Sequence, residues 1–500
     1  MSKTKVLFAA FEATPFIKTG GLGDVAGSLP AYIKNEEFDV RVILPKLSSI
    51  PAEYTERMKF VESYEVPLGW RSVYCGLFTL RRGGVTYYFL DNEYYFKRDN
   101  VYGEFDDGER VAFFSKAVCE TIGHIAKNFM PDILHCNDWH TAMVPVFLRE
   151  QYNGAGDGRV GGKIADYGNI KTVFTIHNLK FQGQYDPWVL GDVCGLHGTP
   201  AEGQLMHDKA ANYLQGAVIY SDAVTTVSPT YAEEICTPEY GEGLDGLFRS
   251  RKYKLSGIVN GIDYKDIDPE TDKRIGAHFS ANELAGKAAC KAALQRELGF
   301  IEDPDVPLFV MISRLTVQKG ANLVRDFASE ITSAEGIRRM QLAVLGTGDA
   351  AFEEAFRGIA SGRKQDLAEG EFAAEVRFSE PLSRRMYAGA DAFLMPSQFE
   401  PCGLSQMMAM RYGCLPVVRE TGGLKDTVKG YWNVGADEAT GFSFRDFDIG
   451  GLRSAVDCAL DVWYNKHDEW LVMQQNTMAE DNSWDASAEK YRELYRALTD

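Results

Sequence analysis

The chain has 500 residues, of which 45% are hydrophobic and 25% are charged, with 48 glycines and 18 prolines. These ordinary globular values exclude disorder, a collagen-like repeat and a coiled coil as descriptions of the whole chain. At roughly 100 to 200 residues per domain, we expect two or three domains. Asp and Glu outnumber Lys and Arg by 71 to 53, and the net charge of −18 disfavours nucleic acid and anionic membrane surfaces as partners.

The nine cysteines are scattered and never form a Cys-x-x-Cys pair. This pattern argues against a disulfide framework and against a zinc ribbon. The N-terminus lacks the long apolar stretch of a signal peptide, and no run of about 18 apolar residues is present for a membrane span. We therefore expect a cytoplasmic protein.

Short apolar runs rich in β-branched and aromatic residues recur along the chain, separated by longer segments with helical periodicity. In the first half these runs are Val6–Phe11, Val40–Leu44, Val85–Leu90, Ile133–Cys136, Thr172–Ile176 and Ala223–Val227. In the second half they are Leu308–Ile312, Gln341–Leu345, Val376–Phe378, Ala392–Met395 and Leu415–Val418. Apolar strands that alternate with helices predict an α/β fold with doubly wound parallel sheets covered on both faces.

Local signals mark one helix, one loop and one domain boundary. Ser280-Ala-Asn-Glu283 has the form of a capping box, and Gly299 ends the helical pattern that follows it. The segment 151–170 is rich in Gly, Asp and Lys and is predicted to be a surface loop. The polar stretch within 250–275 is the predicted break between the two halves.

One hexapeptide occurs almost unchanged in each half. Thr19-Gly-Gly-Leu-Gly-Asp24 returns as Thr421-Gly-Gly-Leu-Lys-Asp426, and both copies follow a predicted strand and lead into a predicted helix. Glycines at such a turn let backbone amides approach a phosphate at a helix N-terminus. The pair predicts two doubly wound domains that share one phosphorylated ligand. The alternative is two ordinary strand-to-helix turns, in which glycine is also common.

Charged residues follow two of the predicted strands in the second half. Arg314 and Lys319 come after Leu308–Ile312, where ligands bind in α/β sheets, and a guanidinium with an ammonium suits a diphosphate. Glu400, in Glu-Pro-Cys-Gly-Leu404, follows Ala392–Met395. A solvated basic turn and an acid favoured by a helix dipole are the alternatives.

Three of the eight histidines, His135, His140 and His177, lie at the ends of two strands, which favours a site there. No Walker A sequence is present, and the Gly21, Gly23, Gly27 register lies too far beyond its strand for a dinucleotide fingerprint. The Asp-x-Asp triplets lie in polar, loop-like stretches, at 266–268, 303–305 and 446–448. No motif requires a metal.

Taken together, eight segments resemble the bacterial glycogen and starch synthases in the right order over nearly the whole chain. They are Lys18–Val25, Asp138–His140, Thr172–Leu179, Thr226–Ala232, Val259–Asp263, Ser313–Gly320, Glu400–Leu404 and Thr421–Leu424. The resemblance implies a GT-B glycosyltransferase with two Rossmann-like domains facing a cleft, at 1–255 and 256–482, and a last helix within 483–500 that crosses back to the first. It also implies elongation of an α-1,4-glucan such as glycogen from ADP-glucose, with UDP-glucose as the alternative donor and neither metal nor pyridoxal phosphate.

The resemblance also assigns residues. The implied catalytic set is Lys18, His177, Arg314, Lys319 and Glu400. The implied donor-binding set is Lys18, Gly20, Gly21, Asp24, Arg314, Lys319, Phe378, Glu400, Cys402, Gly403, Leu404, Thr421, Gly422 and Gly423. The implied acceptor and glucosyl set is Glu12, Tyr102, Asp138, His140, Asn178 and Asn260. Phe378 departs from the family, because many bacterial members carry a tyrosine there.

A single glutamate among several cations disfavours the carboxylate pair of a hydrolase and favours stabilisation of a departing diphosphate. We therefore expect front-face attack by the acceptor 4-hydroxyl, with the leaving phosphate taking the proton. A nicotinamide-dependent oxidoreductase, a glucan-binding sensor without activity, and a phosphorylase or sucrose-linked transferase are the alternatives. Cys402, beside Glu400, is a hypothetical target for thiol reagents.

Overall fold

A computed structural model describes residues 3–152, 167–332, 339–362 and 370–499. The predicted loop at 151–170 therefore lies mostly outside the described residues. The chain forms two compact units, one of Met1–Ile258 with Trp484–Asp500 and one of Val259–Ser483, called unit 1 and unit 2 below. The sequence-based boundaries after residues 255 and 482 lie close to these divisions.

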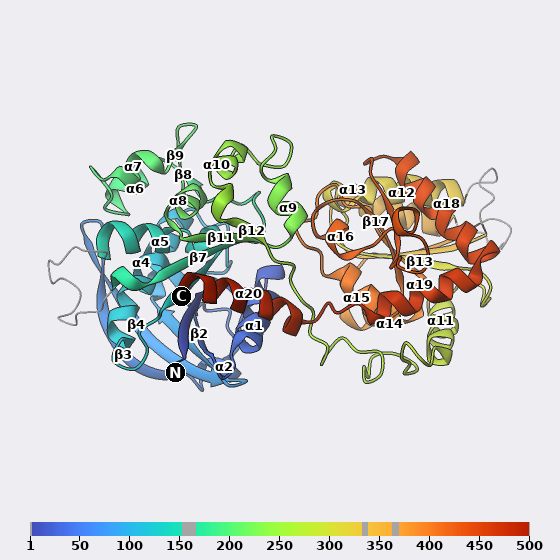
Figure 1. Ribbon diagram of the computed structural model, residues 1–500, viewed down its shortest axis with the longest axis horizontal. Helices are drawn as coiled ribbons and strands as arrows, with labels where there is room; N and C mark the ends of the chain where they lie inside the picture. Colours follow the sequence, from blue (N-terminus) through green and yellow to red (C-terminus); the bar gives the residue numbers. More distant parts are fainter. Residues whose placement is uncertain (1–2, 153–166, 333–338, 363–369, 500) are drawn as a thin grey trace. The chain divides into compact units, whose positions relative to one another are not determined.

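Unit 1 contains a sheet of nine strands in the order β12-β11-β7-β6-β1-β2-β5-β4-β3 (Figure 1). The strands from β12 to β5 are parallel, and the β4 and β3 hairpin adds an antiparallel edge. The central strand β1 is apolar and has no exposed residue from Val6 to Ala9, as expected for a strand covered on both faces. The nine strands are β1 (Thr4–Ala9), β2 (Phe38–Pro45), β3 (Lys59–Leu68), β4 (Arg71–Arg82), β5 (Val85–Asp91), β6 (Ile133–Asn137), β7 (Lys171–Ile176), β11 (Ala223–Thr226) and β12 (Leu255–Gly257).

Helices cover this sheet, and a small sheet of β8 (Gln184–Tyr185), β10 (Ala210–Asn212) and β9 (Met206–His207) accompanies it. Two of the helices begin with a side-chain N-cap. The Asn212 side chain accepts a hydrogen bond from the Gln215 amide, and the Ser228 side chain accepts one from the Tyr231 amide. The helices of unit 1 are α1 (Gly21–Ile33), α2 (Ala52–Thr55), α3 (Glu93–Phe96), α4 (Asp107–Ile125), α5 (Met143–Phe147), α6 (Trp188–Asp192), α7 (Pro200–Gln204), α8 (Tyr213–Tyr220), α9 (Pro229–Glu234), α10 (Asp245–Ser250) and α20 (Trp484–Thr499).

The last helix, α20, belongs to unit 1 although it follows unit 2 in the chain. It packs beside α1, as Figure 1 shows. Its Tyr491 and Tyr495 are fully buried, and the Tyr495 hydroxyl lies 2.6 Å from His135 Nδ1 in β6. The structure thus groups this helix with unit 1.

Unit 2 contains a wholly parallel sheet of six strands in the order β15-β14-β13-β16-β17-β18. The chain runs outward from β13 to β15 and returns to β16 on the other side of β13, which makes the sheet doubly wound. The six strands are β13 (Leu308–Ile312), β14 (Gln341–Leu345), β15 (Glu371–Glu375), β16 (Ala392–Met395), β17 (Leu415–Arg419) and β18 (Phe442–Phe444).

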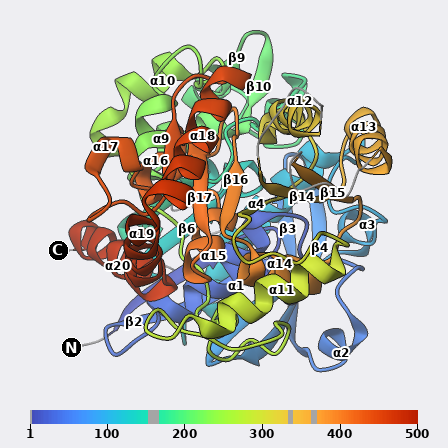
Figure 2. The ribbon, with the colours of Figure 1, turned by 90° about the vertical axis from the view of Figure 1, so that its right-hand side faces the viewer.

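Figure 2 shows the helices of unit 2 in two groups. Helix α12 packs against α13 and α18, and α14 packs against α11 and α15. Helix α12 buries its apolar stripe, Leu323, Val324, Phe327 and Ile331, as an amphipathic helix does. The helices are α11 (Ala285–Glu297), α12 (Ala321–Ile331), α13 (Ala350–Ser361), α14 (Glu380–Gly389), α15 (Ser405–Arg411), α16 (Gly422–Thr427), α17 (Tyr431–Val434), α18 (Ile449–Asn465) and α19 (His467–Ala479).

Two local predictions are wrong. Ser280 and Glu283 are not a capping box: their backbones form an antiparallel bridge, and Glu283 Oε1 accepts the Ala285 amide at 3.2 Å where α11 begins. The strand predicted at Val376–Phe378 is Glu371–Glu375, because the small side chains of this edge strand gave a weak apolar signal. The predicted helix end at Gly299 agrees with the structure, where Gly299 has a φ of +67° after α11.

Candidate active site

In each unit the chain adds strands on one side of a first strand and later continues on its other side, so the winding direction of the sheet reverses there. This first strand is β1 in unit 1 and β13 in unit 2. Ligands of doubly wound sheets bind at the carboxyl ends of the strands beside such a reversal. The predicted site residues follow these strands: the Thr19–Asp24 turn follows β1, Asp138 and His140 follow β6, and Glu400 follows β16. The topology therefore gathers the predicted residues of each unit at one edge of its sheet.

Glu12 holds the turn after β1 in unit 1. Its side chain is buried, and Oε2 accepts hydrogen bonds from the Thr19 amide at 2.5 Å and the Thr19 hydroxyl at 3.0 Å. Burial raises the pKa of Glu12, and the bonds from Thr19 oppose that rise. Lys18, half exposed, pairs with Asp24 Oδ1 at 2.7 Å across the same turn. Glu12 thus fixes a turn that presents a partly solvated lysine.

The glycines of this turn differ in what surrounds them. A Cβ placed on Gly20 or Gly21 meets no heavy atom of the described residues within 4 Å. A Cβ on Gly23 would lie 3.3 Å from Glu12 Oε2 and 3.2 Å from the Lys18 Cα. Packing therefore constrains Gly23, whereas the backbone at Gly20 and Gly21, where α1 begins, faces open space.

His177, at the end of β7, has a fixed orientation. The amide of Asn137 donates to the Ala9 carbonyl at 3.0 Å, which turns Asn137 Oδ1 toward His177 Nε2 at 3.0 Å. Burial lowers the pKa of His177 to about 3, so the ring is neutral and its proton lies on Nε2. The His177 amide donates to Asp138 Oδ1 at 2.7 Å.

Asp138 has an unusual backbone and an unusual pKa. Its φ of +55° is rare for a residue with a side chain, and such strain occurs most often at functional sites. Burial raises its pKa to about 7 against the effect of the His177 and Asn178 amides. Asp138 therefore changes its charge near neutral pH while it orients His177.

The other unit 1 residues lie around this group. His140 is buried and stacks on Tyr102, with ring centroids 4.5 Å apart, and on Phe11. Burial lowers the pKa of His140 to about 3 and raises that of Tyr102, with the Glu12 carboxylate adding to the rise for Tyr102. Asn178 Oδ1 accepts the Lys180 amide at 3.0 Å. These contacts make a rigid aromatic wall beside Glu12.

His135 does not join the site. It lies in the sheet, where Nε2 contacts the Thr175 hydroxyl at 2.6 Å and Nδ1 contacts Tyr495. The interpretation that counted it with His140 and His177 is wrong for His135, because its side chain points into the core that holds α20.

In unit 2 the predicted cation and the predicted acid form one ion pair. Lys319 Nζ donates to Glu400 Oε2 at 2.5 Å, and the two side chains are only 15% and 8% exposed. The Ser397 hydroxyl donates to the same oxygen at 3.1 Å. A backbone bond from the Gln398 amide to the Gln318 carbonyl, at 2.8 Å, ties together the loops that carry them. The pair lies beside the reversal between β13 and β16.

The second glycine turn packs directly on the Glu400 segment. A Cβ on Gly422 would lie 2.0 Å from the Glu400 carbonyl oxygen, and a Cβ on Gly423 would lie 2.0 Å from that of Cys402. The φ of Gly422 is +43°, and that of Gly403 is +73°, both in the left-handed region. Unlike Gly20 and Gly21, these glycines are required by close packing.

The surroundings of three predicted residues of unit 2, Cys402, Asn260 and Phe378, bear on their predicted roles. Cys402 is buried, and burial raises the pKa of its thiol to about 12, so the structure argues against the hypothesis that it reacts with thiol reagents. Asn260 lies against that thiol in unit 2, which the chain enters at Val259, whereas the other residues predicted for the acceptor side are in unit 1. Phe378 is 89% exposed.

The remaining predicted residues lie at helix starts or on the surface. Thr421, which is buried, is the N-terminal cap position of α16, and Leu404, which is partly buried, is that of α15. Arg314 is exposed, and its Nη2 lies 3.5 Å from Gln318 Oε1. Its guanidinium is thus held loosely after β13 and is accessible to an anion.

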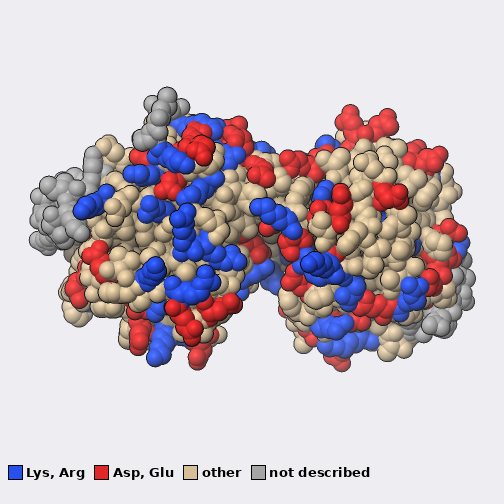
Figure 3. All heavy atoms as spheres, turned by 90° about the horizontal axis from the view of Figure 1, so that it is seen from below, with Lys and Arg blue, Asp and Glu red and all other residues tan. Residues whose placement is uncertain are grey.

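Within the described ranges, no group of three or more His, Cys, Asp or Glu side chains is arranged to hold a metal ion. The same part of the chain contains no helix long and apolar enough to cross a membrane. On the face shown in Figure 3, basic side chains gather over the middle of unit 1, whereas acidic and basic side chains are mixed over unit 2.

Comparison with known proteins identifies the family. Residues 5–250 match the family described as starch synthase catalytic domain, and residues 306–460 match glycosyl transferases group 1. The chain is 46% identical to the glycogen synthase of Clostridium perfringens, over 99% of this chain and 98% of that protein. The chain belongs to the glycogen synthase family. The glycogen synthase of Streptococcus mutans is also 46% identical, over 99% of this chain and all of that one.

Solved structures of related glycosyltransferases confirm the GT-B fold. The catalytic domain of starch synthase IV from Arabidopsis thaliana, bound to ADP and acarbose, aligns over 100% of both chains with a TM-score of 0.85 and 32% identity. Sucrose-phosphate synthase from Thermosynechococcus elongatus has a TM-score of 0.59 over 99% of both chains, and at 17% identity it shows the fold alone. Two doubly wound α/β units, as predicted, make up this member of the glycogen synthase family.

Sequence reasoning missed three residues that hold the predicted ones in place. Thr19 binds Glu12, Asn137 orients His177, and Ser397 binds Glu400. Each lies within three residues of a strand end or of a predicted site residue, but nothing in its own type distinguishes it from ordinary polar loop residues. Only the hydrogen bonds identify them.

Proposed function

We propose that this glycogen synthase family member transfers glucose from ADP-glucose to the 4-hydroxyl at the non-reducing end of an α-1,4-glucan, with retention of configuration. The reaction takes place in the cytoplasm and needs neither a metal ion nor pyridoxal phosphate. The observation that carries the proposal is the buried Lys319–Glu400 pair beside the winding reversal of unit 2. The starch synthase IV relative, solved with ADP and acarbose, supports the donor and acceptor classes for this chain.

In this proposal unit 2 binds the donor. Arg314 and Lys319 neutralise the diphosphate, the amides at the start of α16 contact its distal phosphate, and Phe378 packs against the base. Glu400 and the backbone from Cys402 to Leu404 bind glucose hydroxyls. Lys319 bonded to Glu400 can hold a phosphate oxygen and the sugar-binding carboxylate at one point, because an ammonium group has three protons to donate.

The bonding state of Glu400 favours direct transfer over a covalent intermediate. Its Oε2 is occupied by Lys319 and Ser397, so this oxygen is not free to attack the anomeric carbon. A retaining hydrolase instead uses two carboxylates about 5 Å apart, one of them as nucleophile. The proposed route breaks the bond between the anomeric carbon and the phosphate oxygen and forms the bond to the acceptor 4-oxygen on the same face. The 4-hydroxyl proton passes to the departing ADP phosphate.

Unit 1 supplies the acceptor and glucosyl contacts. Lys18 adds a third cation for the diphosphate, and the open backbone at Gly20 and Gly21 lets the donor approach α1. The neutral ring of His177 and its backbone stabilise the reacting glucosyl group, with Asp138 as the positioning residue. Glu12, Tyr102, His140 and Asn178 line the acceptor side. Preorganised donors of this kind each change turnover by about 100- to 1,000-fold.

The test is nucleotide release from ADP-glucose and from UDP-glucose, each with and without glycogen and each with and without EDTA. We expect glycogen-dependent release of ADP that EDTA does not reduce. Release of UDP alone would keep the chemistry and overturn the donor assignment. Glycogen binding with no release of either nucleotide would overturn the proposal in favour of a sensor.

A further inference from the structure

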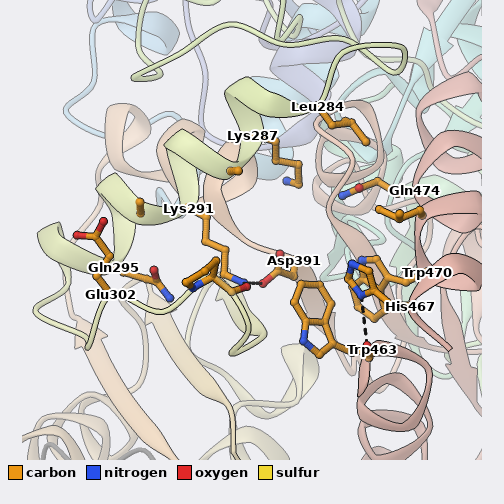
Figure 4. A pocket seen from close by; sticks show the side chains of 14 residues that line it. Leu284, Lys287, Lys291, Gln295, Glu302, Asp391, Trp463, His467, Trp470 and Gln474 are labelled. Carbon is orange, nitrogen blue, oxygen red and sulfur yellow. Dashed lines mark hydrogen bonds and ion pairs between the residues drawn. The ribbon is translucent and has the colours of Figure 1, made fainter. Parts of the chain in front are cut away.

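A cavity lies within unit 2, away from the strand ends that carry the proposed site. It has a volume of about 360 Å³ and lies between α11 on one side and α18 with α19 on the other (Figure 4). This volume falls in the range of small-molecule sites, about 300–1,000 Å³. An apolar wall is supplied by Leu284, which precedes α11, by Ala288 of α11, and by Trp463 and Leu471 of the facing helices.

The floor of this cavity is a buried ion pair. Lys291 Nζ lies 2.8 Å from Asp391 Oδ2, and both side chains are more than nine-tenths buried. The same ammonium donates to the Pro304 carbonyl at 2.8 Å and lies 4.6 Å from the centre of the Trp463 ring. Figure 4 shows Asp391 between Lys291 and Trp463. The floor therefore fixes both charges in place.

Two buried acceptors remain open toward this space. Asp391 Oδ2 accepts Lys291 and the Leu308 amide, whereas no group of the described residues donates to Oδ1. Gln474, 6% exposed, donates through Nε2 to the Gly413 carbonyl at 2.7 Å, and within the described ranges its Oε1 accepts nothing. Both residues line the cavity. Both oxygens can accept hydrogen bonds from a ligand in the cavity that carries donor groups.

The charges of the cavity select a neutral ligand. The ammonium groups of Lys287 and Lys291 both line it and would repel a cation. The Lys287 ammonium is occupied by backbone carbonyls, including that of Ala390 at 2.8 Å, and that of Lys291 is occupied by Asp391 and Pro304. Backbone carbonyls occupy the Lys287 ammonium fully, and the open carboxylate oxygen of Asp391, beside Lys291, would repel an anion.

We infer that this cavity is a non-catalytic binding site for a neutral saccharide, a glucosyl unit or pair of units of an α-glucan chain. Its hydroxyls would donate to Asp391 Oδ1 and Gln474 Oε1, and its apolar face would pack on Trp463 and Leu471. The class of ligand comes from the cavity, and its identity as glucan rests on the proposed function, which places such chains at the protein. The site would hold a glucan on unit 2 independently of the reacting end.

The test follows the Trp463 signal in the full chain labelled with 5-fluorotryptophan, assigned by comparison with Trp463→Phe. Maltose is titrated without nucleotide, so the reading does not depend on turnover. Ala288→Phe fills the mouth of the cavity from α11. Ala289→Phe, at the next exposed position of the same helix but outside the cavity, is the matched control. If Ala288→Phe lowers Tm, the variant Leu471→Glu is used in its place, because Leu471 lines the cavity but is 40% exposed.

We expect a saturable maltose-dependent shift of the Trp463 signal in the wild type. Ala288→Phe should weaken it by at least about tenfold in Kd, and Ala289→Phe should leave it within about twofold. Absence of the shift, an unchanged shift in Ala288→Phe, or a shift with inorganic phosphate or tetramethylammonium in place of maltose would overturn the inference. A shift without ADP-glucose activity would keep this site and refute the proposed function, and activity without a shift would do the reverse.

Discussion

Replacing Lys319 by alanine tests the proposed donor site most informatively, because stability and catalysis should respond to different partners. The variant removes the cation from a Glu400 carboxylate that is 8% exposed and keeps only the Ser397 hydroxyl at 3.1 Å. Removing one partner of a buried ion pair lowers the unfolding free energy by about 3 kcal/mol. The same change removes one phosphate donor, which should lower kcat by about 100- to 1,000-fold.

A second substitution separates the two effects. In Lys319→Ala/Glu400→Gln the amide needs no counter-ion, so most of the lost unfolding free energy should return while kcat stays low. Lys429→Ala is the matched control, because Lys429 pairs with Glu480 at the same 2.5 Å but with side chains 52% and 34% exposed. Exposed pairs contribute at most about 1 kcal/mol, so this variant should keep both its stability and its kcat.

The assay combines urea denaturation with ADP release at saturating glycogen, and glycogen affinity is measured separately. Lys319→Ala should keep its affinity for glycogen while kcat falls. Recovery of kcat in the double variant would refute the reasoning, since Lys319 would then only neutralise Glu400. Equal losses in kcat and glycogen affinity would also count against a role at the diphosphate.

Three further predictions concern the turns, the buried acid and the thiol. Gly20→Ala should lower turnover without changing Tm, because the added Cβ meets no described atom within 4 Å. Gly423→Ala should lower both turnover and Tm, because the added Cβ would lie 2.0 Å from the Cys402 carbonyl oxygen. Between about pH 4 and 7 the folded protein keeps the Asp138 proton that the unfolded chain loses, since the folded pKa is about 7. The unfolding free energy of the wild type should therefore fall relative to Asp138→Asn as pH rises through that window and level off above pH 7, which denaturation at several pH values can check; a constant difference would refute the assignment. The pKa of about 12 for Cys402 predicts no alkylation by iodoacetamide at pH 8 in the native protein, read by mass spectrometry against denatured protein; native labelling at Cys402 would contradict its burial.

The strands, and the site residues that directly follow them, were predictable because both depend on local sequence pattern. Buried parallel strands such as β1 and β13 are continuous apolar runs, and the functional side chains come directly after them. The edge strand β15 was misplaced because Phe372-Ala-Ala374 carries little apolar bulk. The false capping box at Ser280 has the right residue types, but its backbone amides are occupied in a bridge.

What the sequence could not predict depends on partners distant along the chain. The two glycine turns are nearly identical hexapeptides, yet Gly20 and Gly21 of the first face open space, whereas Gly422 and Gly423 of the second pack against the backbone of Glu400 to Cys402. Lys319 and Glu400 are 81 residues apart, and their pairing requires β13 and β16 to be neighbours. The same applies to His135, whose partner Tyr495 lies 360 residues away.

The linkage of the product tests the central claim most directly. Maltotriose is incubated with ADP-glucose and the full chain, and the new anomeric proton is followed by NMR together with the mass of the product. We predict a maltotetraose whose added glucosyl unit is α-linked to the terminal 4-oxygen. A β-linked unit, or free glucose with no longer chain, would contradict retaining transfer at this site.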